Sequence, residues 1–255
     1  MRDEVDAGGA RAGRGSFSLK YAFVFGAFAG LLTLLAFQLR GWAWALCWPA
    51  VSFAGVALAY SGAGPAVFGK CADGRMRPWA VVVLLPYLLL SWMTWGLARR
   101  LSREPSHAEV APGLFIGRRV LPGELPFRPR TVVDLTSEFF EPAPLRDVEH
   151  YVSLPILDGM APEPVFLAEH IERCARLPTP LYVHCAQGHG RTGLVAAALL
   201  VARGLSPEVT SALEQVRGVR PGVRLSAEQR AVLGVLGARL ARSGVPASHG
   251  EAPRD

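Results

Sequence analysis

Three long apolar stretches fill most of the first hundred residues and limit what this chain can fold into. They cover residues 21–39, 42–60 and 79–98, and none of them contains Asp, Glu, Lys or Arg. As a helix, each rises about 1.5 Å per residue and comes close to the roughly 30 Å hydrocarbon core of a bilayer. Tryptophans at the start of the second stretch and Tyr60 at its end suit the two interfacial belts. Residues 21–98 therefore predict a multi-pass membrane region of about three helices, preceded by a tail over residues 1–20.

Two other interpretations of these stretches stay open. Each stretch could be a buried helix of a soluble protein, although three in series near spanning length disfavour this. The first could be the core of a cleaved signal peptide, with Ala43-Trp44-Ala45 as a loose cleavage triplet, but the surrounding tryptophans are poor for cleavage. The only ionisable side chains in the stretches are Cys47 and tyrosines, which gives little support to a transporter or channel.

The rest of the chain has the pattern of a soluble α/β domain. Residues 99–112 are polar, contain two prolines, and are expected to form a linker. Short β-rich runs at 114–117, 131–135, 151–154 and 181–184 then alternate with helical patterns near 164–176 and 192–203. This alternation predicts a small central sheet flanked by helices over residues 113–242, followed by a disordered tail over residues 243–255.

Charge and cysteine content exclude some classes of function. The net charge of +6 comes mostly from arginine and includes no long basic run. It favours anchoring at a membrane edge and anionic substrates, and we expect no nucleic-acid partner. The four cysteines form no C-x-x-C pair, so we interpret them as free thiols of a reducing compartment.

One motif, at a predicted strand-to-helix junction, carries the chemistry. Residues 184–193 read HCAQGHGRTG. Cys185 ends the strand and faces the positive end of the helix dipole, which favours its thiolate. The short residues that follow can curl so that their N–H groups bind a phosphate dianion. Arg191 can grip two phosphoryl oxygens, and Thr192 can donate its hydroxyl to the sulfur as it leaves. The predicted phosphate-binding residues are Ala186, Gln187, Gly188, His189, Gly190 and Arg191.

The pattern H-C-x-x-G-x-x-R-[S/T]-G resembles the protein tyrosine phosphatase superfamily, and its small dual-specificity branch in particular. The resemblance covers roughly residues 114–236 and implies a phosphocysteine intermediate with neither metal nor cofactor. It also implies a general-acid aspartate on a loop some way before the cysteine, and Asp158 fits that place. Asp158 could instead be a turn residue before Gly159. Asp134 and Glu138 are weaker rivals for the same role.

Four further residues have a structural and a functional interpretation. His184 is expected to hold the loop from behind, and Arg220 to support it from beneath. Gln229 is explained by a capping box with Ser226, although the resemblance leaves open that it positions the hydrolytic water. Cys174 is expected in the core, and the resemblance leaves open a protective disulfide with Cys185.

These features predict a membrane-anchored phosphatase of phosphomonoesters, with a phosphorylated protein or lipid as substrate and the bilayer as partner. The alternative is a catalytically silent, membrane-tethered module that binds a phosphorylated partner. A purely structural membrane protein would leave the motif unexplained.

Two features of the sequence disagree about the side of the membrane on which the phosphatase domain lies. Three spans would put the N-terminus and the phosphatase domain on opposite sides. Basic residues in the tail and second loop then weakly favour a cytoplasmic N-terminus. A reactive thiolate instead favours a reducing cytosol around the domain. We follow the thiol chemistry and expect a cytoplasmic phosphatase domain.

Overall fold

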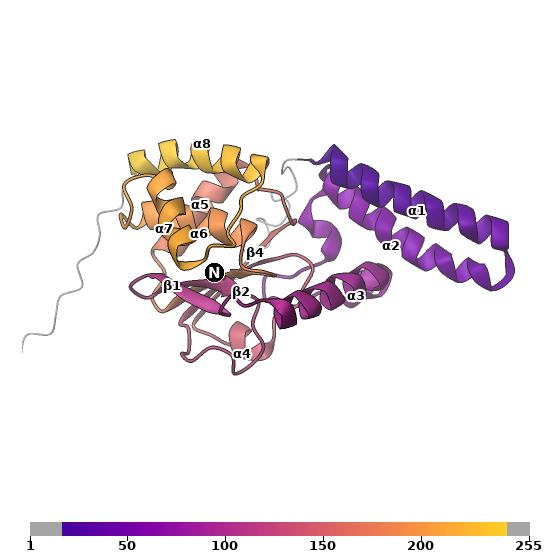
Figure 1. Cartoon of the computed structure of the whole chain (residues 1–255), viewed down its shortest axis with the longest axis horizontal. Helices are drawn as coiled ribbons and strands as arrows, with labels where there is room; N and C mark the ends of the chain where they lie inside the picture. Colours follow the sequence, from indigo (N-terminus) through magenta and orange to yellow (C-terminus); the bar gives the residue numbers. More distant parts are fainter. Residues whose placement is uncertain (1–16, 244–255) are drawn as a thin grey trace, which may run out of the picture.

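The computed structural model describes residues 17–243, as an N-terminal helical part followed by an α/β domain (Figure 1). Three helical segments, Leu19–Leu39, Gly41–Ala63 and Pro78–Leu101, are long and apolar enough to cross a membrane by length and composition. The three long apolar helices expected from the sequence are thus present. Most of the predicted N-terminal tail and nearly all of the C-terminal one lie outside the described residues.

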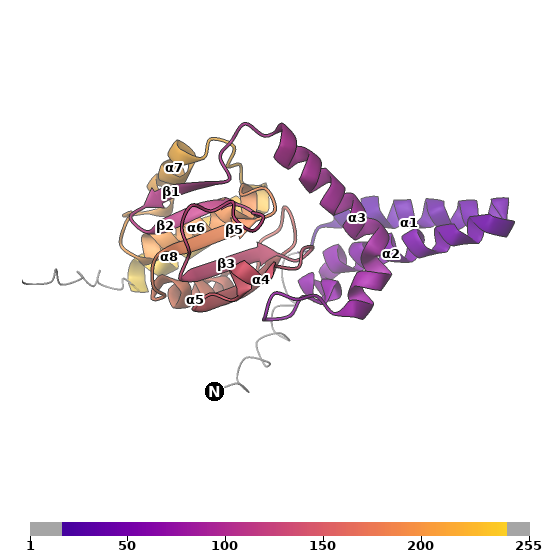
Figure 2. The ribbon, with the colours of Figure 1, turned by 90° about the horizontal axis from the view of Figure 1, so that it is seen from below.

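The first two apolar segments form an antiparallel hairpin that projects from the α/β domain (Figures 1 and 2). Alanines line the buried seam between them, because a small side chain lets two backbones approach closely. At the open end, the Ser18 amide donates to the Tyr60 carbonyl at 2.9 Å, and the rings of Tyr21 and Tyr60 lie 5.1 Å apart. The hairpin consists of α1 (Leu19–Leu39), the 3₁₀ turn η2 (Gly41–Leu46), α2 (Cys47–Leu58) and the π turn η3 (Ala59–Ala63).

The third apolar helix, α3 (Pro78–Leu101), follows the short turn η4 (Pro65–Phe68) and lies between the base of the hairpin and the α/β domain (Figure 2). It packs on α2 and, through Leu84 and Leu88, joins a small apolar cluster that also contains Leu157 and Met160 of the α/β domain. The helical part and the α/β domain therefore share a core.

The α/β domain is built on a five-stranded sheet with the order β1-β2-β5-β3-β4. Only β1 runs antiparallel to its neighbour. The strands are β1 (His107–Ala111), β2 (Leu114–Arg118), β3 (Thr131–Thr136), β4 (His150–Ile156) and β5 (Leu181–Cys185). The linker predicted over residues 99–112 is wrong in its second half, because residues 107–111 form strand β1 of the domain. Its sequence HAEVA is too polar to stand out, but it pairs along β2 and starts the domain.

Helices cover the sheet, and the larger core lies on one of its faces. Helix α6 is buried along its whole length, between the sheet and its neighbours α5, α7 and α8. This explains why its sequence is apolar on every side. The short α4 lies with the smaller cluster around Val132 and Tyr182. The helices are α4 (Ala143–Arg146), α5 (Pro164–Ala175), α6 (Gly190–Ala202), α7 (Val209–Val219) and α8 (Ala227–Ser243).

Candidate active site

The predicted motif forms a tight loop between β5 and α6. Cys185 ends β5 and is 3 % exposed, and its Sγ accepts a hydrogen bond from the Gly188 amide at 3.2 Å. Gly188 has a φ of +73°, and a Cβ at this position would overlap the backbone of Gly117 on β2. The loop therefore curls back over the sulfur only because glycine stands at this position.

Arg191 is placed by a carboxylate that sequence reasoning considered only as a rival general acid. Its Nη1 and Nη2 donate to the two carboxylate oxygens of Glu138 at 3.0 and 2.7 Å, and Nη1 also donates to the Ile156 carbonyl at 3.0 Å. Although burial opposes ionisation, the guanidinium holds the pKa of Glu138 below its usual range. Glu138 therefore stays ionised and orients Arg191, which makes it unsuited to donate a proton.

Asp158 lies on the loop after β4, and its carboxylate reaches Arg191 although most of the side chain is exposed. Its Oδ1 is 3.3 Å from Nη2 of Arg191, and its side chain is 78 % exposed. Its backbone carbonyl accepts from the hydroxyl of Tyr60, at the base of the hairpin, at 3.1 Å. The structure thus brings Asp158, Arg191 and Cys185 to one cavity, with the membrane-type helices beside them.

Thr192 and His184 lie behind the loop. The Thr192 hydroxyl is buried and has no hydrogen-bond partner within residues 17–243, so it is free to donate to a charged sulfur. His184 is stacked near Tyr182, with ring centroids 5.4 Å apart, and lies 3.8 Å from Glu141. Burial lowers the pKa of His184 to about 4, so its ring is neutral.

The loop is held from beneath by Arg220, which donates to the carbonyls of Gly188 and Gln187 at 2.8 and 2.9 Å. Glu104 adds a contact that sequence reasoning missed. Its carboxylate lies 2.7 Å from His189 and accepts from the Gly222 amide at 2.9 Å. Glu104 belongs to the segment expected to be a linker, so its pattern gave no signal for this role.

Gln229 forms the predicted capping box at the start of α8 and also lies at the catalytic cavity. Its side-chain oxygen accepts from the Ser226 backbone amide at 3.1 Å, and its backbone N–H donates to the Ser226 hydroxyl at 3.0 Å. The side-chain nitrogen donates to the carbonyl of Met160, two residues beyond Asp158, at 3.0 Å. Gln229 therefore fastens the Asp158 loop to the start of α8, and it also lines the cavity.

The cavity itself has a volume of about 440 Å³ and walls from both parts of the molecule. From the α/β domain come Cys185, Arg191, Asp158 and the loop residues Ala186, Gln187, His189 and Gly190. From α3 come Tyr87, Ser91, Thr94 and Trp95. Cys174 is elsewhere, in the core against α6. Burial raises the pKa of its thiol to about 11, and all four cysteines are free.

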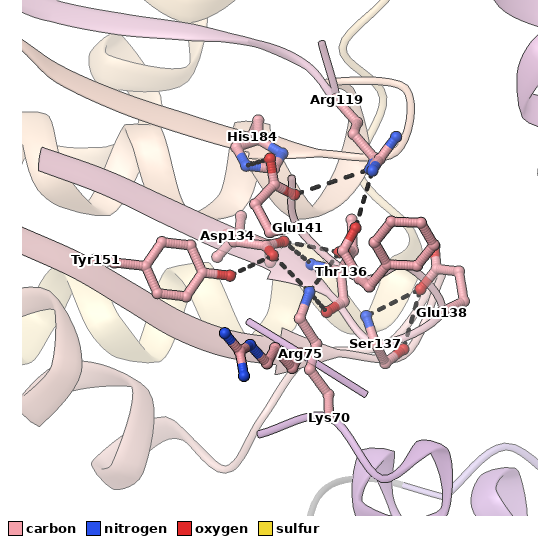
Figure 3. Close-up of polar contacts among 12 residues, drawn as sticks. Lys70, Arg75, Arg119, Asp134, Thr136, Ser137, Glu138, Glu141, Tyr151 and His184 are labelled. Carbon is pink, nitrogen blue, oxygen red and sulfur yellow. Dashed lines mark hydrogen bonds and ion pairs between the residues drawn. The ribbon is translucent and has the colours of Figure 1, made fainter. Parts of the chain in front are cut away.

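Asp134, the other rival acid, is part of a buried cluster at the carboxyl end of β3 (Figure 3). Lys70, from the loop between α2 and α3, forms an ion pair with it, and the Tyr151 hydroxyl donates to it at 2.7 Å. Although burial opposes ionisation, Lys70 holds the pKa of Asp134 below its usual range. Burial and the Asp134 charge raise the pKa of Glu141 to about 8.

This cluster has the composition of a small metal site but already contains a cation. Ligand atoms of Asp134, Glu141 and His184 lie within 4.8 Å of one another. The Lys70 ammonium bonds to Asp134 and to the Thr136 carbonyl, the latter at 2.7 Å. Lys70 therefore supplies the positive charge that a metal ion would bring. The expectation that catalysis needs neither metal nor cofactor stays a prediction.

Known proteins that resemble this chain match its C-terminal part, and they belong to the phosphatase family that the cysteine motif resembles. Residues 130–232 match the family model described as PTP-SAK, Swiss Army Knife protein, DSP-PTPase phosphatase domain. Protein 197R of Invertebrate iridescent virus 6, described as a tyrosine phosphatase, is 36 % identical over 72 residues. That alignment covers 25 % of this chain and 27 % of the viral protein, so the chain spans about a quarter of this relative's length.

Several solved structures resemble the domain. A mouse protein described as a dual specificity phosphatase, complexed with zinc tungstate, has a TM-score of 0.47 and 22 % identity, over 56 % of this chain and 92 % of that one. Tk-PTP in the active form has a TM-score of 0.43 and 29 % identity, over 53 % and 98 %. PTPMT1 in complex with PI(5)P has a TM-score of 0.45 and 18 % identity, over 55 % and 99 %.

The C-terminal domain therefore resembles the protein tyrosine phosphatase class, with a cysteine loop between a parallel strand and a buried helix. More narrowly, it is a dual-specificity phosphatase-like domain, preceded in this chain by three long apolar helices.

Proposed function

We propose that this protein is a membrane-anchored, cysteine-dependent phosphatase that hydrolyses phosphomonoesters through a phosphocysteine intermediate. The observation that carries the proposal is the convergence of Cys185, Arg191 and Asp158 on one cavity. The apolar N-terminal helices support the anchoring, because their exposed side chains are as apolar as a bilayer core requires.

In the first step, Sγ of Cys185 attacks phosphorus and the ester P–O bond breaks. Asp158 donates its proton to the leaving oxygen, which departs as an alcohol. Arg191 and the amides of residues 186–191 bind the three remaining phosphoryl oxygens as negative charge spreads over them. Glu138 keeps the guanidinium in the plane that this contact needs.

In the second step, water attacks phosphorus on the phosphocysteine and Asp158, now a carboxylate, takes its proton. The P–S bond breaks, inorganic phosphate forms, and the sulfur leaves as a thiolate. The unpartnered Thr192 hydroxyl is available to donate to that sulfur. Asp158 thus acts as acid and then as base, and the exposure of its side chain suits exchange with water.

The test is phosphate release from p-nitrophenyl phosphate by the full-length chain in detergent, with a reductant and a metal chelator. The full chain is needed because Lys70 and Trp95, both outside the α/β domain, bond to it. We expect Cys185→Ser to abolish release and Asp158→Asn to lower kcat by about 10²-fold or more. Cys47→Ser, which alters a thiol at the hairpin tip, serves as the matched control and should retain the activity.

The silent binding module makes the opposite prediction. Folded, reduced protein would then bind inorganic phosphate at the loop but release none from any phosphomonoester, and Asp158→Ala would change nothing. Release that survives Cys185→Ser would also contradict the proposed mechanism.

A further inference from the structure

One wall of the catalytic cavity is the apolar helix α3. The indole N–H of Trp95 donates to the carbonyl of Ala186, in the phosphate loop, at 3.1 Å. The indole N–H of Trp92 donates to the carbonyl of Glu138 at 2.9 Å. A helix with the composition of a membrane span is thus seated directly on the loop that binds phosphate and on the residue that orients Arg191.

Both ends of α3 are bonded to the α/β domain. Before its start, Lys70 pairs with Asp134, and the Gly74 carbonyl accepts from the Glu141 amide at 2.8 Å. Near its end, Arg99 forms a 2.6 Å ion pair with Glu124. A bilayer crossed by α3 would separate its two ends by the membrane, so α3 must instead run along the domain on one side.

The outer side of α3 is apolar up to its last turn, where Arg100 is exposed. At 100° per residue its exposed large apolar side chains fall on one face and form a single stripe, which is made of Trp79, Val82, Val83, Leu89, Leu90, Met93, Leu97 and Leu101. The cavity-lining residues lie on the neighbouring side of the helix. Thr94 both lines the cavity and is exposed, so it stands where the cavity wall meets the apolar stripe.

The α1–α2 hairpin indicates what covers that stripe. Helix α1 has 21 residues, a length of roughly 31 Å, which matches a bilayer core. Trp42, Trp44 and Trp48 lie at the tip and Tyr21 and Tyr60 at the base, where two interfacial belts would be. The first half of α3 packs along α2, where the Trp48 indole donates to the Val82 carbonyl at 2.9 Å and the Tyr87 amide donates to the Ser52 hydroxyl at 3.2 Å. The second half of α3 runs from the hairpin to the α/β domain, so a bilayer spanned by the hairpin has its surface at this half (Figures 1 and 2).

The catalytic cavity consequently lies at that surface. The Tyr60 hydroxyl contacts the backbone of Asp158, and Tyr21 lies beside Gly159, where a Cβ would be 3.3 Å from its hydroxyl. The general-acid loop thus touches the residues that mark the membrane interface. A substrate that already resides in the bilayer needs only its headgroup to enter, whereas a folded phosphoprotein would have to approach between the membrane and α3.

From this geometry we propose that the substrate is a phosphomonoester carried by a lipid of the same bilayer. The phosphate enters past Thr94 to Cys185, and the acyl chains stay beside the apolar stripe of α3. The cavity of about 440 Å³ is of a size that holds a headgroup. The proposal rests on the phosphatase function proposed above and names its substrate class.

The test uses the full-length protein in phosphatidylcholine vesicles. Each vesicle preparation contains dioleoyl phosphatidic acid or a dioleoyl phosphatidylinositol monophosphate, and each lipid is compared with its water-soluble dihexanoyl form, which has the same headgroup. At least one long-chain lipid should be hydrolysed about tenfold faster than its short-chain form at equal total concentration, because enzyme and substrate share a surface. A phosphotyrosine peptide and p-nitrophenyl phosphate complete the set.

Two substitutions by tryptophan, one at the cavity entry and one away from the cavity, make the comparison more specific. Thr94→Trp narrows the entry from the bilayer side and should lower long-chain lipid hydrolysis at least about fivefold more than p-nitrophenyl phosphate hydrolysis. Leu31→Trp places the same ring on α1, at a position that is 52 % exposed and outside the cavity, and should change neither rate.

Equal rates on long-chain and short-chain forms, or a phosphopeptide hydrolysed faster than every lipid, would overturn the lipid proposal. So would a Thr94→Trp variant with the same loss on all substrates. Loss of Cys185-dependent release from p-nitrophenyl phosphate is a different result, because it would overturn the phosphatase function itself.

Discussion

At Gly188 the phosphate loop packs against the backbone of Gly117 on β2, and the effect of this close approach on stability can be separated from ordinary backbone strain. Gly188 and Gly204 have φ values of +73° and +68°, but only Gly188 has a neighbour that a Cβ would overlap. Alanine at either position costs about 1–2 kcal/mol for the left-handed conformation. We expect Gly188→Ala to lose at least about 2 kcal/mol more, because the Gly117 backbone must move, and to lose phosphatase activity.

Gly204→Ala is the matched control and should keep its activity. The measurement is thermal unfolding of both variants in detergent, together with phosphate release. Equal destabilisation of the two variants would show that the approach to Gly117 is not a constraint.

Glu141 predicts a pH dependence of stability. Burial and the Asp134 charge raise its pKa to about 8, above its ordinary value of 4.5. The folded protein therefore holds a proton that the unfolded chain releases, so the contribution is complete below about pH 4.5 and is lost as pH rises through about 8. In Glu141→Gln the group no longer titrates. The stability of the wild type relative to Glu141→Gln should fall between pH 5 and 8 by up to about 1.4 kcal/mol per pH unit. Parallel unfolding curves for the two proteins across that range would contradict this assignment.

At the residue scale, the sequence predicted what local spacing encodes and missed what the fold assembles. The spacing of Cys185, Gly188 and Arg191 follows from one loop, so a motif suffices to find them. Glu138 and Glu104 reach the same loop from distant segments, and nothing in their neighbouring residues marks them. Their positions depend on the sheet order and on the path of the chain after α3.

At the scale of elements, four strands and the main helices of the domain follow from hydrophobic patterning, whereas β1 and the loop between α2 and α3 do not. The pattern gives Lys70 the role of a charge at a membrane edge. In the structure its side chain is fully buried against Asp134, 64 residues away in sequence. Such a pairing depends on tertiary packing, which periodicity does not report.

Lys70→Met should therefore destabilise the α/β domain, although Lys70 is not part of it. The substitution leaves the Asp134 carboxylate buried without its cation, which typically costs about 3–5 kcal/mol. Arg75→Met, in the same loop, removes an arginine whose side chain is 70 % exposed and should change stability by less than about 0.5 kcal/mol. The free energy of unfolding of the full-length proteins in detergent measures both effects.

A double variant tests the origin of the loss. Lys70→Met combined with Asp134→Asn removes the uncompensated charge and should recover part of the stability that Lys70→Met alone loses. If the second substitution adds to the first instead, the pairing with Asp134 is not the cause.

At the scale of the whole molecule, hydropathy predicted three long apolar helices, and these are present. Hydropathy does not tell which of them cross, because it scores length and composition and does not detect that both ends of α3 are bonded to the domain. With only α1 and α2 crossing, the N-terminus and the phosphatase domain share a side. Arg40 is then the one basic residue at the hairpin tip, whereas the Lys and Arg residues of segments 1–20 and 70–77 lie on the same side as the domain. Counting Lys and Arg now favours a cytoplasmic domain, in agreement with the thiol chemistry.

The two arrangements differ in where the loop between α2 and α3 lies, and single cysteines can locate it. Arg40→Cys marks the hairpin tip, Asp73→Cys marks that loop, and Glu149→Cys marks the domain surface. Each is introduced with Cys47 and Cys71 replaced by serine and with the buried Cys174 and Cys185 retained.

In intact cells, a membrane-impermeant maleimide should label the Arg40→Cys protein alone. The other two proteins should react only after lysis, because the two-crossing arrangement puts Asp73 and Glu149 on the cytoplasmic side. Three crossings would instead put Arg40 and Glu149 on one side and Asp73 on the other, so a difference in labelling between Asp73→Cys and Glu149→Cys would overturn the two-crossing arrangement and, with it, the position of α3 at the membrane surface.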